Sequence, residues 1–180
     1  VNWGEGALLV LAGPGSGKTR VLTCRIARLL EEGRDESFRI LALTFTNKAA
    51  DEMKDRLASY VPGLEERANI GTFHSFCGQV LRQHGVHLGI QPDFTIYSQD
   101  NDRKAVLEDA LKSAGLDPQN ARYLSLVDRA KTLLIAPSEA AARLTKAADP
   151  QGIADTYLAY ESELRRVNAL DFNSLIFEAF

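Results

Sequence analysis

The sequence has few residues of the kinds that stabilise small secreted proteins or cross membranes. Of its 180 residues only two are cysteine, Cys24 and Cys77. Because they lie far apart and each falls within a predicted helix, we expect buried free thiols and no disulfide framework. No apolar run approaches the length of about 20 residues that spans a bilayer, and no basic, apolar leader opens the sequence. We therefore predict a soluble, cytoplasmic protein without a membrane partner.

The sequence also lacks an excess of positive charge. Lys and Arg number 21 against 24 Asp and Glu, which gives a formal net charge of −3. This balance argues against a protein that coats nucleic acid through bulk charge, so any such binding depends on a local group of residues. His84 and His87, with Cys77 upstream, do not have a recognised metal-ligand spacing. We interpret these histidines as surface or helix-end residues.

The clearest motif is the glycine-rich segment Ala12–Thr19, which follows an apolar run and precedes a helical pattern. A phosphate-binding loop reads Gly-x-x-x-x-Gly-Lys-Ser/Thr between a strand and a helix, and only its first position, Ala12, differs here. Its glycines let successive N–H groups converge on a polyphosphate, and the helix start adds free N–H groups and a positive dipole end. The alternative is a glycine-rich turn with a chance Lys-Thr. We predict a site for the polyphosphate of a nucleotide and for Mg²⁺.

The side chains of this loop have expected roles. Lys18 should reach the β- and γ-phosphates while the Thr19 hydroxyl binds Mg²⁺, so these two are the predicted catalytic residues and Thr19 is the predicted metal ligand. Arg20 lies either on a solvated helix face or near the nucleotide. The residues predicted to contact ATP are Gly13, Gly15, Ser16, Gly17, Lys18, Thr19 and Arg20.

Strands and helices alternate over the first half of the chain. The predicted strands are 7–11, 39–45 and 68–73, and the predicted helices are 18–31, 48–57 and 75–83. Segment 7–11 is apolar at every position, so we expect it to be a central strand covered on both faces. Thr46-Asn47 offers an N-cap for the second helix. Such alternation predicts an α/β fold with a parallel sheet and right-handed crossovers.

The composition changes near residue 90, and beyond it only Phe94–Tyr97 still has an extended pattern. All later segments are predicted to be helical. The predicted helices span about 99–114, 152–167 and 172–180, and two others begin after Asp117-Pro118 and at Ser138. Asp171 is the predicted N-cap of the last helix.

Four segments are distinctive when they are taken together. They are Ala12–Arg20, Thr44–Ala50, Gly71–Phe76 and Asn168–Phe172. In this order they resemble the amino-terminal part of superfamily-one DNA helicases of the UvrD, Rep and PcrA type, and the resemblance covers essentially the whole chain. It implies a partial RecA-like P-loop lobe at 1–90, an incomplete helical insertion at 91–180, and an ATP-driven, 3′-to-5′ translocase on single-stranded DNA.

The resemblance also implies which residues bind single-stranded DNA, because the family's second and third motifs contact it. Both groups follow predicted parallel strands, at the sheet edge where open α/β folds bind ligands. They combine aromatic faces with small polar donors, which suits binding without sequence preference. Core packing is the alternative for each phenylalanine alone. The implied DNA-binding residues are Phe45, Thr46, Asn47, Thr72, Phe73 and His74.

No predicted strand ends in Asp-Glu, the pair that binds magnesium and orients water in the family. We therefore expect a piece of a larger enzyme, partnered by a second RecA-like lobe, and no ATP hydrolysis by residues 1–180 alone. One alternative within the family is the helicase subunit of a recombination nuclease complex. Another is a P-loop small-molecule kinase or nucleotide-binding regulatory module without a DNA role, which leaves Thr44–Ala50 and Gly71–Phe76 unexplained.

Overall fold

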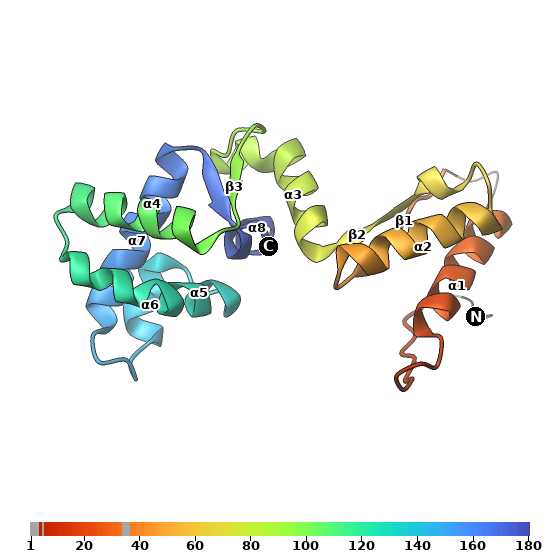
Figure 1. Cartoon of the computed structure of the whole chain (residues 1–180), viewed down its shortest axis with the longest axis horizontal. Coiled ribbons are helices and arrows are strands. Elements are labelled where there is room, and N and C mark those ends of the chain that lie inside the picture. Colours follow the sequence, from red (N-terminus) through yellow and green to blue (C-terminus); the bar gives the residue numbers. More distant parts are fainter. Residues whose placement is uncertain (1–3, 5, 34–36) are drawn as a thin grey trace. The chain divides into compact units, whose positions relative to one another are not determined.

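The structure is a computed structural model that describes residues 4, 6–33 and 37–180 (Figure 1). Its contacts define two compact units, Val1–Phe76 and Cys77–Phe180. The division falls inside helix α3 (Phe73–His84), whereas the composition suggested a boundary near residue 90. Both units combine helices with a pair of short parallel strands, so the described chain is a mixed α/β structure. The assignment of its two parts as lobe and insertion stays a prediction.

The first unit is built on a β-α-β arrangement. Strand β1 (Ile40–Thr44) pairs in parallel with β2 (Ala68–Thr72), and the register aligns Thr44 with Thr72. Helix α2 (Asn47–Tyr60) connects the two strands, since a parallel pair needs a crossover that returns the chain to the starting edge. The predicted parallel pairing of these two strands is confirmed.

An apolar core joins the strands of the first unit to α2 and to α1 (Lys18–Glu32). Burial of each large side chain stabilises the fold by about 1.5–3 kcal/mol. Arg67 links the segment before β2 to the segments around β1 and the end of α1, because its guanidinium donates to the Gly33 carbonyl at 3.0 Å and lies 4.7 Å from the ring centre of Phe38. The principal core residues are Ile26, Leu30, Ala42, Ala50, Met53, Leu57 and Ile70.

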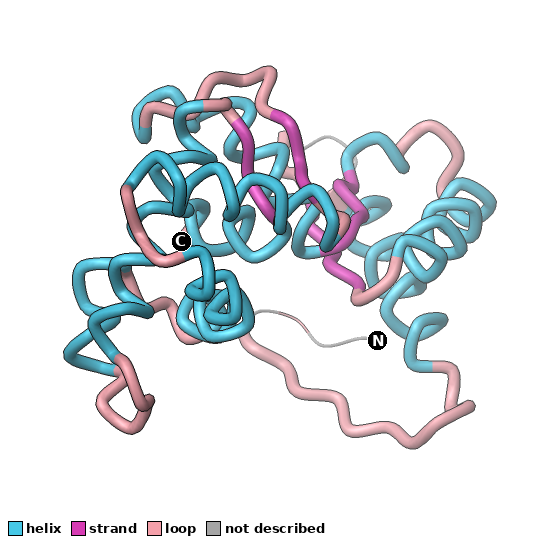
Figure 2. The backbone as a smooth tube through the Cα atoms, turned by 60° about the vertical axis from the view of Figure 1, so that its left-hand side comes forward, coloured by secondary structure: helices cyan, strands magenta, loops and turns pink. Residues whose placement is uncertain are grey.

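Segment 7–11 is not a strand, so the sequence prediction was wrong here. Leu9 is 82% exposed and Leu11 86% exposed, and the described chain before α1 is drawn as a loop in Figure 2. A strand depends on hydrogen bonds to a neighbouring strand. Within the described residues, β1 and β2 pair with each other and neither pairs with 7–11. The apolar run 7–11 indicated a buried strand, but the described residues provide no neighbouring strand that would cover it.

Helix α7 (Pro150–Arg166) is the central element of the second unit. It packs on α4 (Asp100–Ala114) and on α6 (Pro137–Arg143), and it also contacts α5 (Leu124–Thr132). Its buried face carries Ile153, Tyr157, Tyr160 and Leu164.

Short 3₁₀ helices complete the described helical segments. One lies in the first unit, at Glu65–Arg67, and two lie in the second, at Gly85–Leu88 and Pro118–Tyr123. The last begins where Asp117-Pro118 predicted a helix start.

A second parallel pair lies in this unit, where the sequence predicted only helices beyond residue 97. Strand β3 (Thr95–Tyr97) pairs with β4 (Ala169–Asp171). Strand β4 was missed because its three residues lie between two predicted helices and include the predicted N-cap Asp171, and so short a segment shows no strand period of its own. Asp171 Oδ1 then accepts the Ser174 N–H at 2.7 Å and caps α8 (Phe172–Ala179), as predicted.

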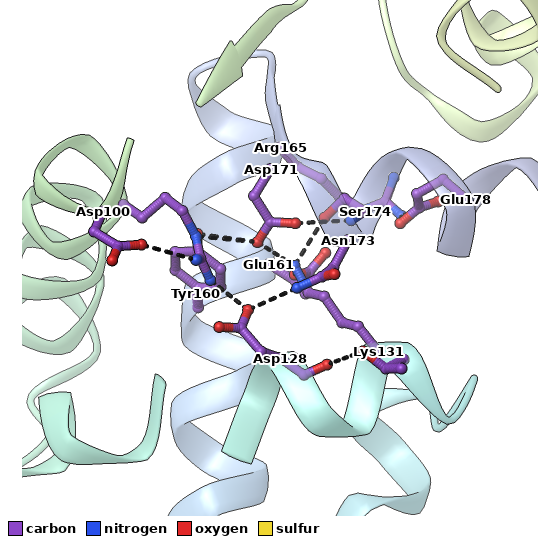
Figure 3. A network of polar contacts seen from close by, with 12 residues as sticks. Asp100, Asp128, Lys131, Tyr160, Glu161, Arg165, Asp171, Asn173, Ser174 and Glu178 are labelled. Carbon is purple, nitrogen blue, oxygen red and sulfur yellow. Dashed lines mark hydrogen bonds and ion pairs between the residues drawn. The ribbon is translucent and has the colours of Figure 1, made fainter. Parts of the chain in front are cut away.

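A buried ionic network crosses the interior of the second unit (Figure 3). Lys131 Nζ lies 2.8 Å from Asp171 Oδ2, 2.8 Å from Ser174 Oγ and 2.5 Å from Glu161 Oε1. The Tyr160 hydroxyl also donates to Asp171, at 3.1 Å. Burial alone would raise the pKa of Asp171, but Lys131 and the N–H of Ser174 together lower it by more than burial raises it, so its net pKa is below the ordinary value. Burial raises the pKa of Glu161 despite Lys131.

Two further expectations concern cysteines and membranes. Cys24 and Cys77 are free, but both are half-buried where buried thiols were predicted. In the part of the chain that the structure describes, no helix is both long and apolar enough to cross a bilayer.

Candidate functional site

The glycine-rich loop forms the turn that leads into α1. Gly15 has φ +73° and Gly17 φ +82°, in the left-handed region that strains any residue with a Cβ atom. Gly17 is the N-cap position of α1, so the N-cap residue has no side chain that could cap the helix, and the first turn contains no acidic residue. The N-cap residue therefore offers the first N–H groups of α1 no side-chain acceptor. A helix N-terminus in this condition attracts an anion.

The side chains of the loop converge on one carbonyl. Lys18 Nζ donates to the Gly13 oxygen at 2.8 Å, and Ser16 Oγ donates to the same oxygen at 2.7 Å. Both side chains are exposed, as are Thr19 and Arg20 in the first turn of α1. The Lys18 ammonium is thus held at the loop by an exposed acceptor that a phosphate oxygen can replace.

The face of α1 beside this loop is only partly covered. A cavity of about 420 Å³ lies between residues 6–10 and the helix, and Lys18, Val21 and Leu22 contribute to its lining. Val21 and Leu22 stay exposed because 7–11 does not pack onto them as a strand.

The fit of the loop to a magnesium triphosphate is good for the phosphates and incomplete for the metal. Thr19 supplies an exposed hydroxyl in the first turn of α1. Among the described residues, no three His, Cys, Asp or Glu side chains are grouped to hold a metal ion. The sequence does contain Asp51-Glu52, but this pair lies on α2 and not at the end of a strand, and Asp51 pairs with Lys54 at 3.4 Å. Mg²⁺ takes many ligands from phosphates and water, so Thr19 fits it as one of several.

Two predicted DNA-binding aromatic residues lie at the same edge of the sheet in the first unit. Thr44 and Thr72 are register partners at the ends of β1 and β2, and Phe45 and Phe73 follow them directly. Phe45 is 96% exposed and Phe73 is 55% exposed. Core packing, the alternative explanation from the sequence, therefore does not account for Phe45.

The polar residues at this edge also have structural roles, of which the sequence predicted only the cap at Thr46. Thr46 Oγ1 accepts the Ala49 N–H at 3.2 Å and caps α2. Thr72 Oγ1 accepts the Ser75 N–H at 3.2 Å, and Ser75 Oγ accepts the Thr72 N–H at 3.0 Å. This reciprocal pair resembles a capping box at the start of α3. Asn47 is exposed at the first position of α2, and His74 is half-buried.

Segment Asn168–Phe172 lies in the second unit and mainly organises its structure. Asn168 has φ +47°, and its side chain accepts the Gln91 N–H at 3.1 Å and donates to Asp93 at 3.0 Å. Asp171 is fully buried against Lys131. The sequence indicated the cap at Asp171 but gave no signal for its pairing with a lysine forty residues away.

The comparisons with known proteins identify the class. The whole chain, residues 1–180, matches the family described as UvrD/REP helicase N-terminal domain, and it belongs to that family. It is 41% identical over 175 residues to the ATP-dependent DNA helicase PcrA of Staphylococcus aureus (strain Mu50 / ATCC 700699). It is 42% identical over 175 residues to the protein of the same name in Staphylococcus epidermidis (strain ATCC 12228 / FDA PCI 1200). Each alignment covers 96% of this chain and 24% of the relative, so the chain spans about a quarter of the length of these proteins. The resemblance stated from the motifs is confirmed.

Proposed function

We propose that residues 1–180 belong to an ATP-dependent DNA helicase that binds ATP at the glycine-rich loop and single-stranded DNA at the β1–β2 edge. The observation that carries this proposal is the register of Thr44 with Thr72, because it brings Phe45 and Phe73 to one edge of the unit that holds the loop. Membership of the helicase family and the names of the PcrA relatives support it. A RecA-like lobe at 1–90 and a helical insertion at 91–180 are part of the proposal.

The proposed ATP site uses groups of the first unit. The N–H groups after Gly15 and Gly17 hold the phosphates, and Lys18 exchanges the Gly13 carbonyl for a β- or γ-phosphate oxygen. The Thr19 hydroxyl binds Mg²⁺, which neutralises charge on the phosphates when it is bound. Arg20 lies one position further along α1, where it can approach the same phosphates.

The proposed DNA site combines stacking with helix N-termini. Phe45 and Phe73 offer faces on which bases stack without regard to sequence. Helices α2 and α3 begin at this edge, and their N-terminal dipole ends favour phosphate groups. Thr46, Asn47, Thr72 and His74 supply the polar contacts. Movement from 3′ to 5′ and a second RecA-like lobe as partner follow from the family resemblance.

The test measures phosphate release by the complete helicase with and without single-stranded DNA. We expect DNA to stimulate turnover, and Lys18→Ala to abolish it without unfolding the protein, because Lys18 is exposed on a loop. Lys54→Ala is the matched control, since Lys54 is an exposed lysine on α2 that pairs with Asp51 at the helix surface. Unchanged turnover in Lys18→Ala would remove the ATP site. Turnover indifferent to DNA would favour a small-molecule kinase or a regulatory nucleotide-binding module.

A further inference from the structure

The second unit contains an open groove that the proposed helicase function does not use. It encloses about 530 Å³ beside α5, α6 and the start of α7. Its lining is largely aliphatic, and Leu133, at the end of α5, is 52% exposed. The aliphatic lining residues used below are Leu126, Leu133, Ile135, Leu144 and Ile153.

Three cations border this groove. Arg129 and Lys146 form no ion pair with a carboxylate in the described part of the chain, and Arg143 reaches Glu139 only at 3.9 Å with both side chains more than half exposed. Such an exposed pair contributes little. The groove therefore carries a local positive charge on a protein whose net charge is −3.

Asp149 is the acidic residue in the lining of this groove, and its single negative charge offsets only part of the charge of the three cations. Asp149 Oδ1 accepts the Gly152 N–H at 2.9 Å, and Oδ2 accepts the Tyr123 hydroxyl at 2.9 Å. These two hydrogen bonds lower the pKa of Asp149, so the carboxylate stays ionised as the N-cap of α7.

The connection from α5 to α6 exposes two leucines and contains a residue with an unfavourable backbone angle. The Ile135 N–H donates to the Ala130 carbonyl at 2.9 Å, and the Leu134 N–H to that of Lys131 at 2.9 Å, which is the pattern of a Schellman helix end. Leu134 has φ +53° at the position where such ends usually have glycine. Leu134 itself does not line the groove, whereas its two neighbours, Leu133 and Ile135, do.

We propose that this groove docks an amphipathic, acidic segment of a partner protein. Its apolar side chains enter the aliphatic floor, and its Asp or Glu side chains meet Arg129, Arg143 and Lys146. A helix with apolar residues three and four positions apart has this form. Nucleic acid fits less well, because the aromatic lining residue Tyr123 is buried and offers no stacking face, and phosphates lose hydration against leucines. The proposal does not depend on the helicase function.

The test uses residues 1–180 and a fluorescein-labelled 16-residue peptide with Leu at positions three and four apart and Glu between them. Fluorescence anisotropy compares it with a scrambled peptide of the same composition and with a labelled duplex DNA. We expect the designed peptide to bind more tightly than the scrambled one. Lys146→Glu, Arg129→Glu and Leu133→Ser should each weaken binding roughly threefold to tenfold, as expected for reversal of a rim charge or loss of one apolar contact.

Matched controls distinguish binding in the groove from effects of overall charge and surface hydrophobicity. Lys112→Glu makes the same charge change at an exposed position of α4, and Leu158→Ser removes an equally exposed leucine from α7, and neither residue lines the groove. Thermal melts establish that each variant is folded, and Lys146→Glu decides if Leu133→Ser does not fold. Equal binding of the scrambled peptide, or equal losses in control and groove variants, would overturn the proposal. Loss of DNA binding in the groove variants, with the peptide unaffected, would assign the groove to nucleic acid instead.

Discussion

Phe45 and Phe73 each follow one member of the register pair Thr44–Thr72, so two exposed aromatic side chains leave the first unit at one sheet edge. Neither ring belongs to the apolar core beneath the strands. This relationship makes a DNA-binding role testable apart from stability, because an exposed ring can be removed without opening a cavity.

Phe45→Ala in the complete helicase should weaken single-stranded DNA binding by about 1–3 kcal/mol if a base stacks on the ring. The free energy of unfolding should change by less than about 0.5 kcal/mol, because Phe45 is 96% exposed. A binding titration beside a urea unfolding curve measures both quantities. Phe38→Ala is the control: its half-buried ring packs on the core and under Arg67, so it should lower stability and spare DNA affinity. Normal DNA affinity in Phe45→Ala would contradict the stacking role.

Thr46→Ala should lower the free energy of unfolding of the first unit by about 1 kcal/mol, because the N–H of Ala49 loses its acceptor. Thr46→Ser keeps the hydroxyl and should retain most of this stability. The DNA-binding role adds a separate expectation, which is that Thr46→Ala weakens DNA binding while folded protein is still present. Chemical denaturation of both variants tests the capping role, and equal stabilities of Thr46→Ala and Thr46→Ser would argue against it.

Lys131→Met should lower the free energy of unfolding of the second unit by about 3–5 kcal/mol. The change leaves Asp171 and Glu161 buried without the cation that now lies 2.8 Å and 2.5 Å from them. Lys112→Met, at an exposed position on α4, makes the same substitution outside the network and should have little effect. Unfolding monitored by circular dichroism provides the comparison. A similar small effect for both lysines would show that the network contributes little.

Asp171→Asn should change how stability depends on pH. In the wild type the folded-state pKa of Asp171 is below its unfolded value, so its contribution is present above about pH 4 and is lost as pH falls through the folded-state pKa. Glu161 has a raised pKa, so its protonation partly offsets this loss at low pH. The stability gap between wild type and Asp171→Asn should therefore be largest at pH 7 and should narrow toward pH 3. Urea unfolding at several pH values measures it, and a constant gap would contradict the assignment.

Residues 1–180 alone should hydrolyse no ATP. The loop can still bind phosphates, but the described residues place no Asp-Glu pair at a strand end. The proposed second RecA-like lobe would also supply an arginine finger, which alone contributes about 10³–10⁵ in rate. Phosphate release by purified residues 1–180 should equal that of a Lys18→Ala control, with or without single-stranded DNA. Turnover that Lys18→Ala abolishes would show that another carboxylate is catalytic, and Asp51, Glu52, Glu65 and Glu66 are then the residues to replace.

Features that depend on neighbours within a few positions could be read from the sequence. The left-handed glycines Gly15 and Gly17, and the caps at Thr46 and Asp171, are examples. Each involves a hydrogen bond or backbone angle within about one turn of the chain, so the residue type itself determines it. The parallel pairing of β1 with β2 was also predictable, because a predicted helix separates two predicted strands, and such a crossover returns the chain for parallel pairing.

The sequence by itself determined the loop, the helix starts and the family, because these depend on local chemistry and on motif order. The tertiary structure decided what depends on distant partners. Segment 7–11 is apolar yet unpaired, since a strand needs a neighbour that the described residues do not provide. Lys131 looks like an ordinary helical lysine, but packing buries it against Asp171. Burial and pairing between residues far apart are properties of the packed chain, and no local pattern specifies them.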